Sequence, residues 1–480
     1  MDQLYGAAAL IVVGFGILYC FGLVAAGALE FRRTHRRVSD QGCGDYAVAD
    51  EAAASGTTQS SHHVYALVAA LNEEVVIEAT VRGLLGQSPQ LRVILVDDAS
   101  TDDTVAIAQH AGGDRIQIVS RVLPDARLGK GPALNVGFAH VVEDVLQRQL
   151  DPTQVLVCVM DADGRLSTGA VNNVAVLFED ERVGGVQLAV RILNRDSLLT
   201  EMQDFEFWGV SALAQVGRMG TGTVSLGGNG QFARLSALQG LGRPPWSASL
   251  TEDLDLTISL LLDGWRLTSS LDASVGQQAV GSLRQLVRQR TRWFQGHMVC
   301  GRRLLEIWGS RRMSHAAVFE LSLYLSIPWL LVLPWSVFFH VGLLFALSGA
   351  DVLDAGSSGG IGRTLAWLVV SFAPHLSFGV LYARRNRAVG VLRALLLSQM
   401  LIVITYVGYI AAWAGLRRIL RQQNEWEKTA RQADTAVAVP VTLERVQHLP
   451  VLSTHAVIPV SHVRTQERLS AQRRHRAPDL

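Results

Sequence analysis

The sequence predicts an α/β fold in which a mostly parallel sheet is covered by helices on both faces and is joined to α-helical transmembrane segments. Between residues 64 and 272, short runs of Val, Ile and Leu alternate with longer helical stretches, the pattern of buried parallel strands connected by helices. Outside this region, four stretches are apolar and long enough to cross a bilayer. Charged residues make up only 18% of the 480 residues, against roughly 25% in soluble domains, so part of the chain is expected to lie in lipid.

The N-terminal segment, residues 1–31, is predicted to be a transmembrane anchor. Its apolar stretch, 5–29, has about the length that a span needs, roughly 20 residues, and no basic residue precedes it, which disfavours a cleaved signal peptide. The arginines that follow at once predict a cytoplasmic location for the rest of the chain by the positive-inside rule. Residues 32–63, rich in Ala, Gly, Ser, Thr and Asp, are predicted to be a flexible linker. The four arginines are Arg32, Arg33, Arg36 and Arg37.

An α/β domain is predicted over residues 64–280. Because its strands are continuous apolar runs separated by helices, the connections are expected to be right-handed crossovers. The expected strands cover 64–71, 91–96, 116–119, 155–160 and 186–190, and the expected helices cover 73–85, 102–111, 133–146 and 170–178.

The remaining sequence predicts membrane association. Residues 281–315 are basic and amphipathic, typical of a helix lying in the membrane surface. Residues 316–420 contain three further apolar stretches, and Pro328 predicts that the first is kinked or partly re-entrant. Three full spans would place the tail, 421–480, outside, whereas Arg417 and Arg418 predict a cytoplasmic tail, so one stretch is not expected to be a simple crossing. The tail itself lacks helical periodicity and is expected to be largely disordered.

Charge and cysteine usage argue against a nucleic-acid-binding protein, a disulfide framework and a zinc site. Lys and Arg number 43 against 42 Asp and Glu, so the net charge of +1 provides no positive surplus for binding nucleic acid. The four cysteines stand far apart without a Cys-x-x-Cys pair, a pattern that favours neither a disulfide framework nor a zinc site.

Two acidic motifs follow predicted strands, at the edge where open α/β sheets bind ligands. Asp97 and Asp98 come after the second strand, and their carboxylates can accept hydrogen bonds from a base or a ribose. Asp161 and Asp163 follow the fourth strand, and such a pair can share a divalent cation such as Mg²⁺ or Mn²⁺. Each motif also suits an ordinary turn or helix start, where acidic residues are common.

A third motif, Thr251-Glu252-Asp253, opens a predicted helix. One interpretation is a helix start in which Thr251 caps the first turn and the acids interact with the helix dipole. The other interpretation makes one carboxylate a general base that accepts the proton of an attacking hydroxyl.

A fourth motif places Gln289, Arg292 and Trp293 on one face of a predicted helix, at positions i, i+3 and i+4. An arginine here can neutralise a diphosphate leaving group, and an indole can stack on a sugar ring. A membrane-surface helix with Arg and Trp at the lipid boundary would show the same pattern.

In their order and spacing, these motifs resemble those of the membrane-bound, inverting family 2 glycosyltransferases, the group of cellulose, hyaluronan, chitin and poly-N-acetylglucosamine synthases. The resemblance covers residues 64 to about 431. It includes Asn72 and Glu73 after the first strand, the Gly-Lys-Gly-Pro-Ala-Leu-Asn segment at 129–135 and the Trp-Glu-Lys-Thr-Ala-Arg segment at 426–431.

The resemblance implies a GT-A-like fold, a UDP-sugar donor and a Mg²⁺ or Mn²⁺ ion. It implies that Asp161 and Asp163 bind the metal and the donor, and that Asp253, next to Glu252, supplies the general base. The loop at 227–232 falls where such enzymes shape the acceptor site. The other substrate-binding residues that it implies are Asn72 and Glu73, then Asp97 and Asp98 at the uridine, Lys130 at the diphosphate, and Gln289, Arg292 and Trp293 on the acceptor and leaving-group wall.

The function expected from this resemblance is transfer of a sugar, with inversion, to a growing polysaccharide by a multi-pass protein of the cell membrane with a cytoplasmic catalytic domain. The expected partners are the donor, a carbohydrate or lipid acceptor, membrane lipid and an unidentified export partner. One alternative is transfer of a single sugar to a membrane lipid, such as diacylglycerol or a polyprenyl phosphate. Another is a transporter or scaffold with a degenerate catalytic domain. No Gly-x-Gly-x-x-Gly follows the first strand, which argues against a dehydrogenase.

Overall fold

The computed structural model describes residues 62–348, 375–386 and 389–423, together with five single positions between 14 and 27. Most of the predicted anchor, nearly all of the linker, most of the second apolar stretch after residue 316 and nearly all of the tail therefore lie outside the described residues.

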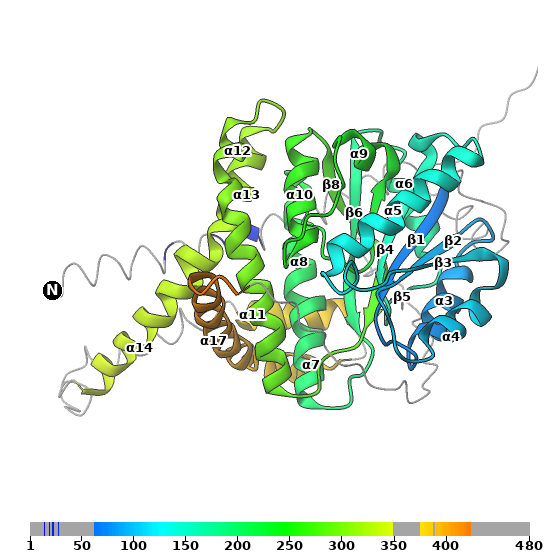
Figure 1. Cartoon of the computed structure of the whole chain (residues 1–480). Coiled ribbons are helices and arrows are strands. Elements are labelled where there is room, and N and C mark those ends of the chain that lie inside the picture. The colour runs from blue at the N-terminus through cyan, green and yellow to red at the C-terminus, as the bar shows by residue number, and fades with distance from the viewer. Residues whose placement is uncertain are drawn as a thin grey trace, which may run out of the picture. The chain divides into compact units, whose positions relative to one another are not determined.

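A central sheet organises the α/β region, with the strand order β3-β2-β1-β4-β7-β6-β8-β5 (Figure 1). Strands β3, β2, β1 and β4 are mutually parallel, whereas β7 runs antiparallel to both of its neighbours and β5 runs antiparallel to β8. The strands are β1 His63–Ala70, β2 Arg92–Asp97, β3 Ile116–Ser120, β4 Val155–Asp161, β5 Arg165–Leu166, β6 Val183–Ile192, β7 Gln231–Arg234 and β8 Arg266–Gln277. The predicted α/β sheet is confirmed, and its second half is mixed.

Helices cover both faces of this sheet, as predicted (Figure 1). On β1, Leu67 packs into a core with α5, whereas its neighbours Ala66 and Val68 pack into a second core with α3 and α6, because successive strand side chains point to opposite faces. The helices are α3 Ile77–Leu85, α4 Thr104–Gly112, α5 Lys130–Gln147, α6 Ala170–Leu177, α7 Leu198–Asp204, α8 Ala212–Met219, α9 Leu235–Gly240 and α10 Glu252–Leu262. Three-residue 3-10 turns precede β3 and β4, at Gly113–Arg115 and Pro152–Gln154.

The first turn of α5 lies directly against the segment that leads into α10. A Cβ atom at Gly131 would lie 2.1 Å from the carbonyl oxygen of Ser247, so only glycine permits this approach. The Asn135 side chain donates a hydrogen bond to the Trp246 carbonyl at 2.6 Å and accepts one from the Trp246 amide at 3.1 Å. These contacts bring Lys130, the first residue of α5, close to the start of α10.

The region after β8 is helical. The stretch predicted as an interfacial helix contains α11 Leu283–Cys300, a 3-10 turn at Gly301–Arg303 and α12 Leu304–Gly309. Beyond it come α13 His315–Ser326, a π-helix at Ile327–Val332, α14 Leu333–Ser348, a helix over 375–385, α16 Val391–Gln399 and α17 Leu401–Leu420.

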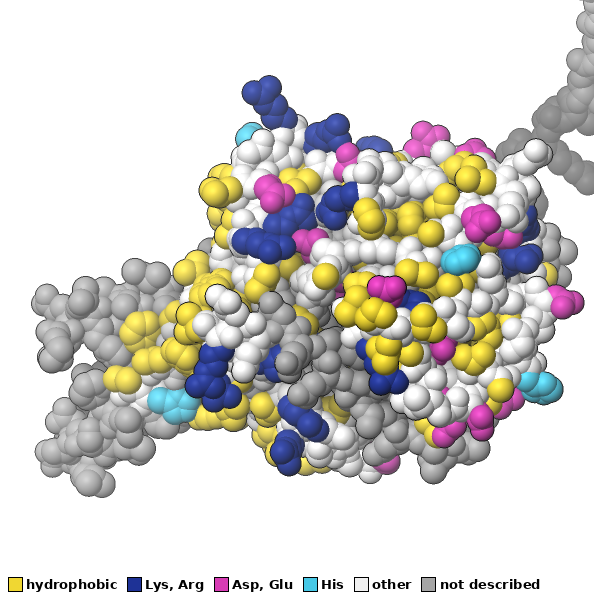
Figure 2. Space-filling model, viewed as in Figure 1, with side chains coloured by type: hydrophobic (Ala, Val, Ile, Leu, Met, Phe, Trp, Pro, Cys, Tyr) yellow, Lys and Arg dark blue, Asp and Glu magenta, His cyan; other side chains and the backbone are white. Residues whose placement is uncertain are grey.

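Two helical runs of the described residues, His315–Val341 and Val391–Leu420, are long and apolar enough to cross a membrane by length and composition. In the first run, the α-helix gives way to a π-helix around Pro328, where the sequence predicted a kink. Its first half packs into the core of the α/β region, because Val318, Leu321 and Leu325 of α13 are buried there. Hydrophobic side chains gather where α13 and α14 lie, with Lys and Arg beside them (Figure 2).

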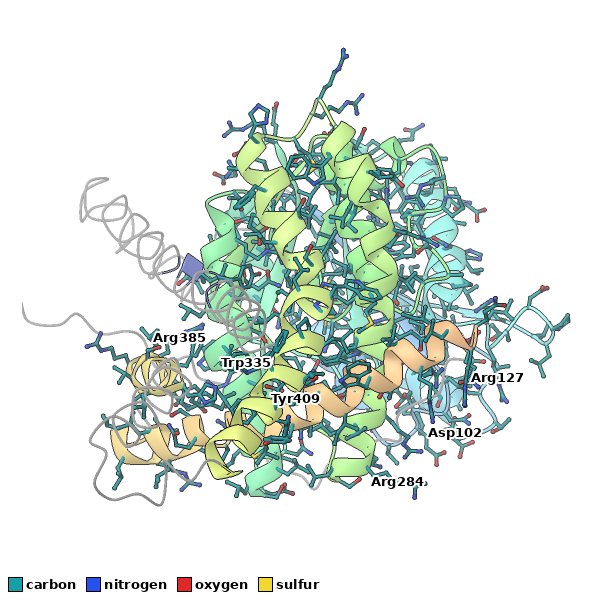
Figure 3. All side chains as sticks on the ribbon, turned by 90° about the vertical axis from the view of Figure 1, so that its left-hand side faces the viewer. Asp102, Arg127, Arg284, Trp335, Arg385 and Tyr409 are labelled. Atoms are coloured by element: carbon teal, nitrogen blue, oxygen red, sulfur yellow. The ribbon has the colours of Figure 1, made fainter. Side chains whose placement is uncertain are left out.

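The second run packs on α11 through α17, which lies across it (Figure 3). A Cβ atom at Gly415 would lie 3.1 Å from the backbone nitrogen of Gln295, so glycine allows the two helices to approach closely. The Arg418 guanidinium donates a hydrogen bond to the Gln295 side chain at 2.8 Å. The basic end of α17 is therefore held at α11, the helix that carries the fourth motif.

Candidate active site

A cavity of about 520 Å³ opens at the carboxyl ends of β1 and β4, between the sheet and helices α8, α10 and α11. Carboxyl ends of parallel strands meet at one edge of a sheet, so residues far apart in sequence converge there. The predicted site residues that line the cavity are Glu73, Asp98, Lys130, Asp161, Glu252, Asp253, Gln289, Arg292 and Trp293.

Three predicted site residues, Asn72, Asp97 and Asp163, do not line this cavity. The Asn72 side chain accepts a hydrogen bond from the Thr101 amide at 2.7 Å, and Asp97 accepts one from the Ser100 amide at 3.0 Å. Both residues therefore shape the loop between β2 and α4. Their predicted roles in substrate binding stay predictions.

Asp98 reaches the cavity but is already engaged in an ion pair. Its carboxylate lies 2.6 Å from the Arg121 guanidinium and accepts a hydrogen bond from the Arg127 amide at 3.0 Å. Both side chains of the pair are less than a tenth exposed. Asp98 thus anchors the loop between β3 and α5, the loop that leads into Lys130.

Lys130 is the cationic centre of the cavity. Its ammonium group donates hydrogen bonds to Asp161 Oδ1 at 2.5 Å and to the Gly228 carbonyl at 2.7 Å. Burial alone would lower the pKa of Lys130, but the charges of Asp161 and Glu252 outweigh burial and raise it. Lys130 therefore remains a cation between the acids of β4 and those of α10.

Glu252 and Asp253 form a coupled acidic pair at the start of α10. Burial first, and then the charge of Asp253, raises the pKa of Glu252 to about 7. Burial also raises the pKa of Asp253, although Lys130 opposes the rise. Thr251 occupies the N-cap position, but its side chain makes no capping hydrogen bond, and its hydroxyl contacts Cys300 Sγ at 3.6 Å. Glu252 and Asp253 thus enter the cavity from a helix start that the Thr251 side chain does not cap.

The acidic pair after β4 provides oxygen donors of the kind that Mg²⁺ and Mn²⁺ prefer. Asp161 lines the cavity, whereas Asp163 is 1% exposed and accepts a hydrogen bond from the Gln278 amide at 3.0 Å. Over 62–348, 375–386 and 389–423, no three His, Cys, Asp or Glu side chains are grouped to hold a metal. Mg²⁺ in nucleotide sites typically takes only one or two carboxylates and completes its shell with phosphate and water, so Asp161, the member of the pair that lines the cavity, fits such a site.

The helix α11 brings Gln289, Arg292 and Trp293 to the cavity on one face, as their spacing predicted. Arg292 lies close enough to Glu252 for its charge to lower the pKa of that carboxyl, although burial dominates. The arginine between them, Arg290, is buried and pairs with Glu206 at 2.8 Å.

Among the cavity residues that sequence reasoning missed are Glu206, Phe207 and His297. The first two lie on a π-helix, Phe205–Ser211, between α7 and α8, and its altered turn leaves no periodic signal. The His297 Nε2 atom lies 3.0 Å from the Tyr324 carbonyl oxygen, which can only accept, so Nε2 carries the proton. Burial lowers the pKa of His297 to about 4, which keeps the ring neutral at the cavity wall.

Comparison with known proteins finds similarity to glycosyltransferases. Residues 62–296 match the family model described as glycosyltransferase like family 2. The chain is 29% identical over 346 residues to a β-monoglucosyldiacylglycerol synthase of a Nostoc species, covering 67% of this chain and 66% of that protein. It is 27% identical over 390 residues to the probable glycosyltransferase YdaM of Bacillus subtilis, covering 77% and 86% of the two chains.

More distant similarities extend to polymer synthesis. The chain is 26% identical over 234 residues to a poly-β-1,6-N-acetyl-D-glucosamine synthase of Staphylococcus aureus, covering 48% of this chain and 53% of that protein. Among solved structures, a mannosyltransferase of Pyrobaculum calidifontis is similar with a TM-score of 0.47 and 16% identity, over 84% of this chain and 99% of that chain.

Proposed function

The chain carries a family 2 glycosyltransferase domain, and on that basis we propose that it transfers a sugar with inversion from a UDP-sugar to a growing polysaccharide at the cytoplasmic face of the cell membrane. One observation carries the proposal. Asp161, Lys130 and Asp253, which are distant in sequence, line one cavity together with Arg292 of α11. Anchoring by several spans and an export partner for the polymer belong to the same proposal.

Each of these residues has a place in a single displacement. Asp253 accepts the proton of the attacking hydroxyl while the new oxygen–carbon bond forms at the anomeric carbon and the bond to the UDP oxygen breaks on the opposite face. Lys130 and Arg292 offer positive charge to the departing diphosphate. Asp161 and Asp163 would hold Mg²⁺ or Mn²⁺, which supplies further positive charge for the diphosphate when bound. No covalent enzyme intermediate is needed.

A lipid acceptor is the second candidate function. The similarity to a β-monoglucosyldiacylglycerol synthase covers 67% of this chain, whereas that to the poly-N-acetylglucosamine synthase covers 48%. The matched part amounts to 66% of that lipid-modifying relative, so its acceptor comes to this chain only as a proposal. The wall of the cavity formed by α11, against which α17 packs, would then face a lipid rather than a sugar chain.

Product analysis separates the two candidates. The full-length protein in nanodiscs is supplied with labelled UDP-glucose or UDP-N-acetylglucosamine, diacylglycerol and Mg²⁺ or Mn²⁺. Labelled product that resists lipid extraction supports the polysaccharide proposal, whereas chloroform-soluble label supports the glycolipid. A chain that consumes neither nucleotide sugar contradicts the proposed transfer and favours a degenerate transporter or scaffold.

Removal of divalent metal is expected to reduce transfer by about 10²-fold or more, since charge on the leaving diphosphate would lose its main counter-ion. The measurement is product formation after EDTA treatment and again after Mg²⁺ or Mn²⁺ is added back. The Asp161→Asn variant should need more metal for half-maximal activity. Equal activity with and without EDTA would contradict a metal role.

The transfer rate is expected to rise with pH through a midpoint near 7. Below that pH, Glu252 takes up a proton and loses its negative charge. That charge normally raises the pKa of the neighbouring Asp253 carboxyl, so without it Asp253 is a weaker base. The Glu252→Gln variant should lack this rise in rate near pH 7. The measurement is kcat between pH 6 and 8.5 for both proteins, and superimposable profiles would contradict the assignment.

A further inference from the structure

The π-helix Phe205–Ser211 contributes both to the active-site cavity and to a buried aromatic cluster. Glu206 and Phe207 line the active-site cavity, whereas Phe205 and Trp208 are buried on the other side in a cluster with Tyr382. π-helical turns are rare and frequently occur at functional sites. The unusual turn therefore places two side chains against α11 that an unbroken α-helix would direct elsewhere.

Arg290 connects this π-helix to Trp293. Its guanidinium lies 2.8 Å from the Glu206 carboxylate and 4.1 Å from the centre of the Trp293 ring. It also lies 5.2 Å from the Phe207 ring, whose centroid is 6.1 Å from that of Trp293 in a T-shaped arrangement at 74°. The indole is thus contacted on its face by a cation and, in a T-shaped pair, by a second ring.

The burial of Arg290 makes this arrangement depend on Glu206. Arg290 is 7% exposed, so water cannot replace a lost ion-pair partner without movement of the side chain. Burial lowers the pKa of Arg290, and the charge of Glu206 counteracts this effect. Loss of the carboxylate would therefore release the guanidinium, and the indole would lose the contact that fixes its orientation.

We propose that Arg290, held by Glu206, is a positioning residue that orients the Trp293 indole for the acceptor. Arg290 thereby determines how much of the donor is transferred to the acceptor rather than to water. The inference rests on the proposed function, in which Trp293 belongs to the acceptor wall. It differs from that function because it concerns the ratio of two reactions and not the existence of transfer.

The test compares Arg290→Lys and Glu206→Gln with the wild-type protein in nanodiscs. Lysine keeps the charge but cannot stack its planar group on the ring. Transfer to the acceptor that the wild type uses, from the product analysis above, is measured alongside UDP release without acceptor. Both variants should raise the acceptor KM or lower transfer by about tenfold or more, because small misplacements cost up to about 10²-fold. UDP release to water should fall much less than transfer to the acceptor, since Arg290 and Glu206 act on the acceptor through the Trp293 indole.

A matched control is available in Arg385, whose guanidinium stacks on Trp208 at the same 4.1 Å but away from the cavity (Figure 3). Arg385→Lys removes a contact of the same kind, so it reports the general effect of losing one. It should leave both transfer and UDP release within about twofold of wild type. In a Trp293→Ala background, Arg290→Lys should cause no further loss, because the ring that it orients is absent.

The outcomes distinguish this inference from the proposed function. If the wild type transfers sugar and Arg290→Lys equals it, the inference alone is overturned. The same holds if transfer and UDP release fall together, because that pattern indicates a general defect. A wild-type protein that consumes no UDP-sugar overturns the proposed function and this inference with it.

Discussion

Asp253→Asn is expected to reduce sugar transfer by about 10²- to 10⁴-fold, the usual contribution of a general base. Asparagine has nearly the same shape as aspartate but cannot accept the proton of the attacking hydroxyl. The carboxylate lies at the start of α10, where its Oδ1 accepts a hydrogen bond from the Leu254 amide at 2.7 Å, so the side chain is oriented before substrate binds. The measurement is the initial rate of labelled product formation, with calorimetry to show that UDP binding is retained.

Asp255→Asn provides the matched control for that experiment. Asp255 lies two residues further along the same helix, is buried, and pairs with Arg303 at 3.2 Å rather than lining the cavity. The same substitution there should lower thermal stability while leaving the transfer rate per folded molecule nearly unchanged. Full activity of Asp253→Asn would remove this residue from the mechanism.

Lys130→Met is expected to reduce transfer at pH 7 by about 10²-fold and to move the pH optimum upward. The Lys130 ammonium faces Asp161, Glu252 and Asp253, and it offsets their mutual repulsion. Without this cation, the pKa values of Glu252 and Asp253 should rise further, so the pair holds more protons at neutral pH. The departing diphosphate also loses one preorganised charge, a loss that commonly costs about 10²- to 10³-fold.

The pH–rate profile tests this prediction, with Lys130→Arg as the comparison. Arginine keeps the positive charge, so its profile should stay close to that of the wild type even if the rate is lower. An unshifted profile for Lys130→Met would show that Lys130 does not control the protonation of the α10 acids. If Lys130→Met lowers the rate without shifting the pH–rate profile, Lys130 acts only on the departing diphosphate.

The parallel half of the sheet and the order of its motifs follow from the sequence. Long runs of Val, Ile and Leu predict buried strands, and acids that come directly after them must reach the carboxyl edge. Asp98 and Asp161 are two such acids, and both line the cavity. Strands β5, β7 and β8 were not predicted. β5 and β7 are short, and β8 carries buried serines such as Ser269, whose hydroxyl donates to the Gln187 carbonyl at 2.8 Å. Their stability comes from pairing with distant strands.

By itself, the sequence determined which side chains the site could use, because strand ends and helix faces are local, periodic features. Only the tertiary structure decided which of them meet. It directs Asn72 and Asp97 into a loop, places Lys130 between acids from β4 and α10, and pairs Arg290 with Glu206, 84 residues away. The physical reason is that an ion pair between distant residues leaves no repeat in the chain, whereas its strength depends on burial that the whole fold creates.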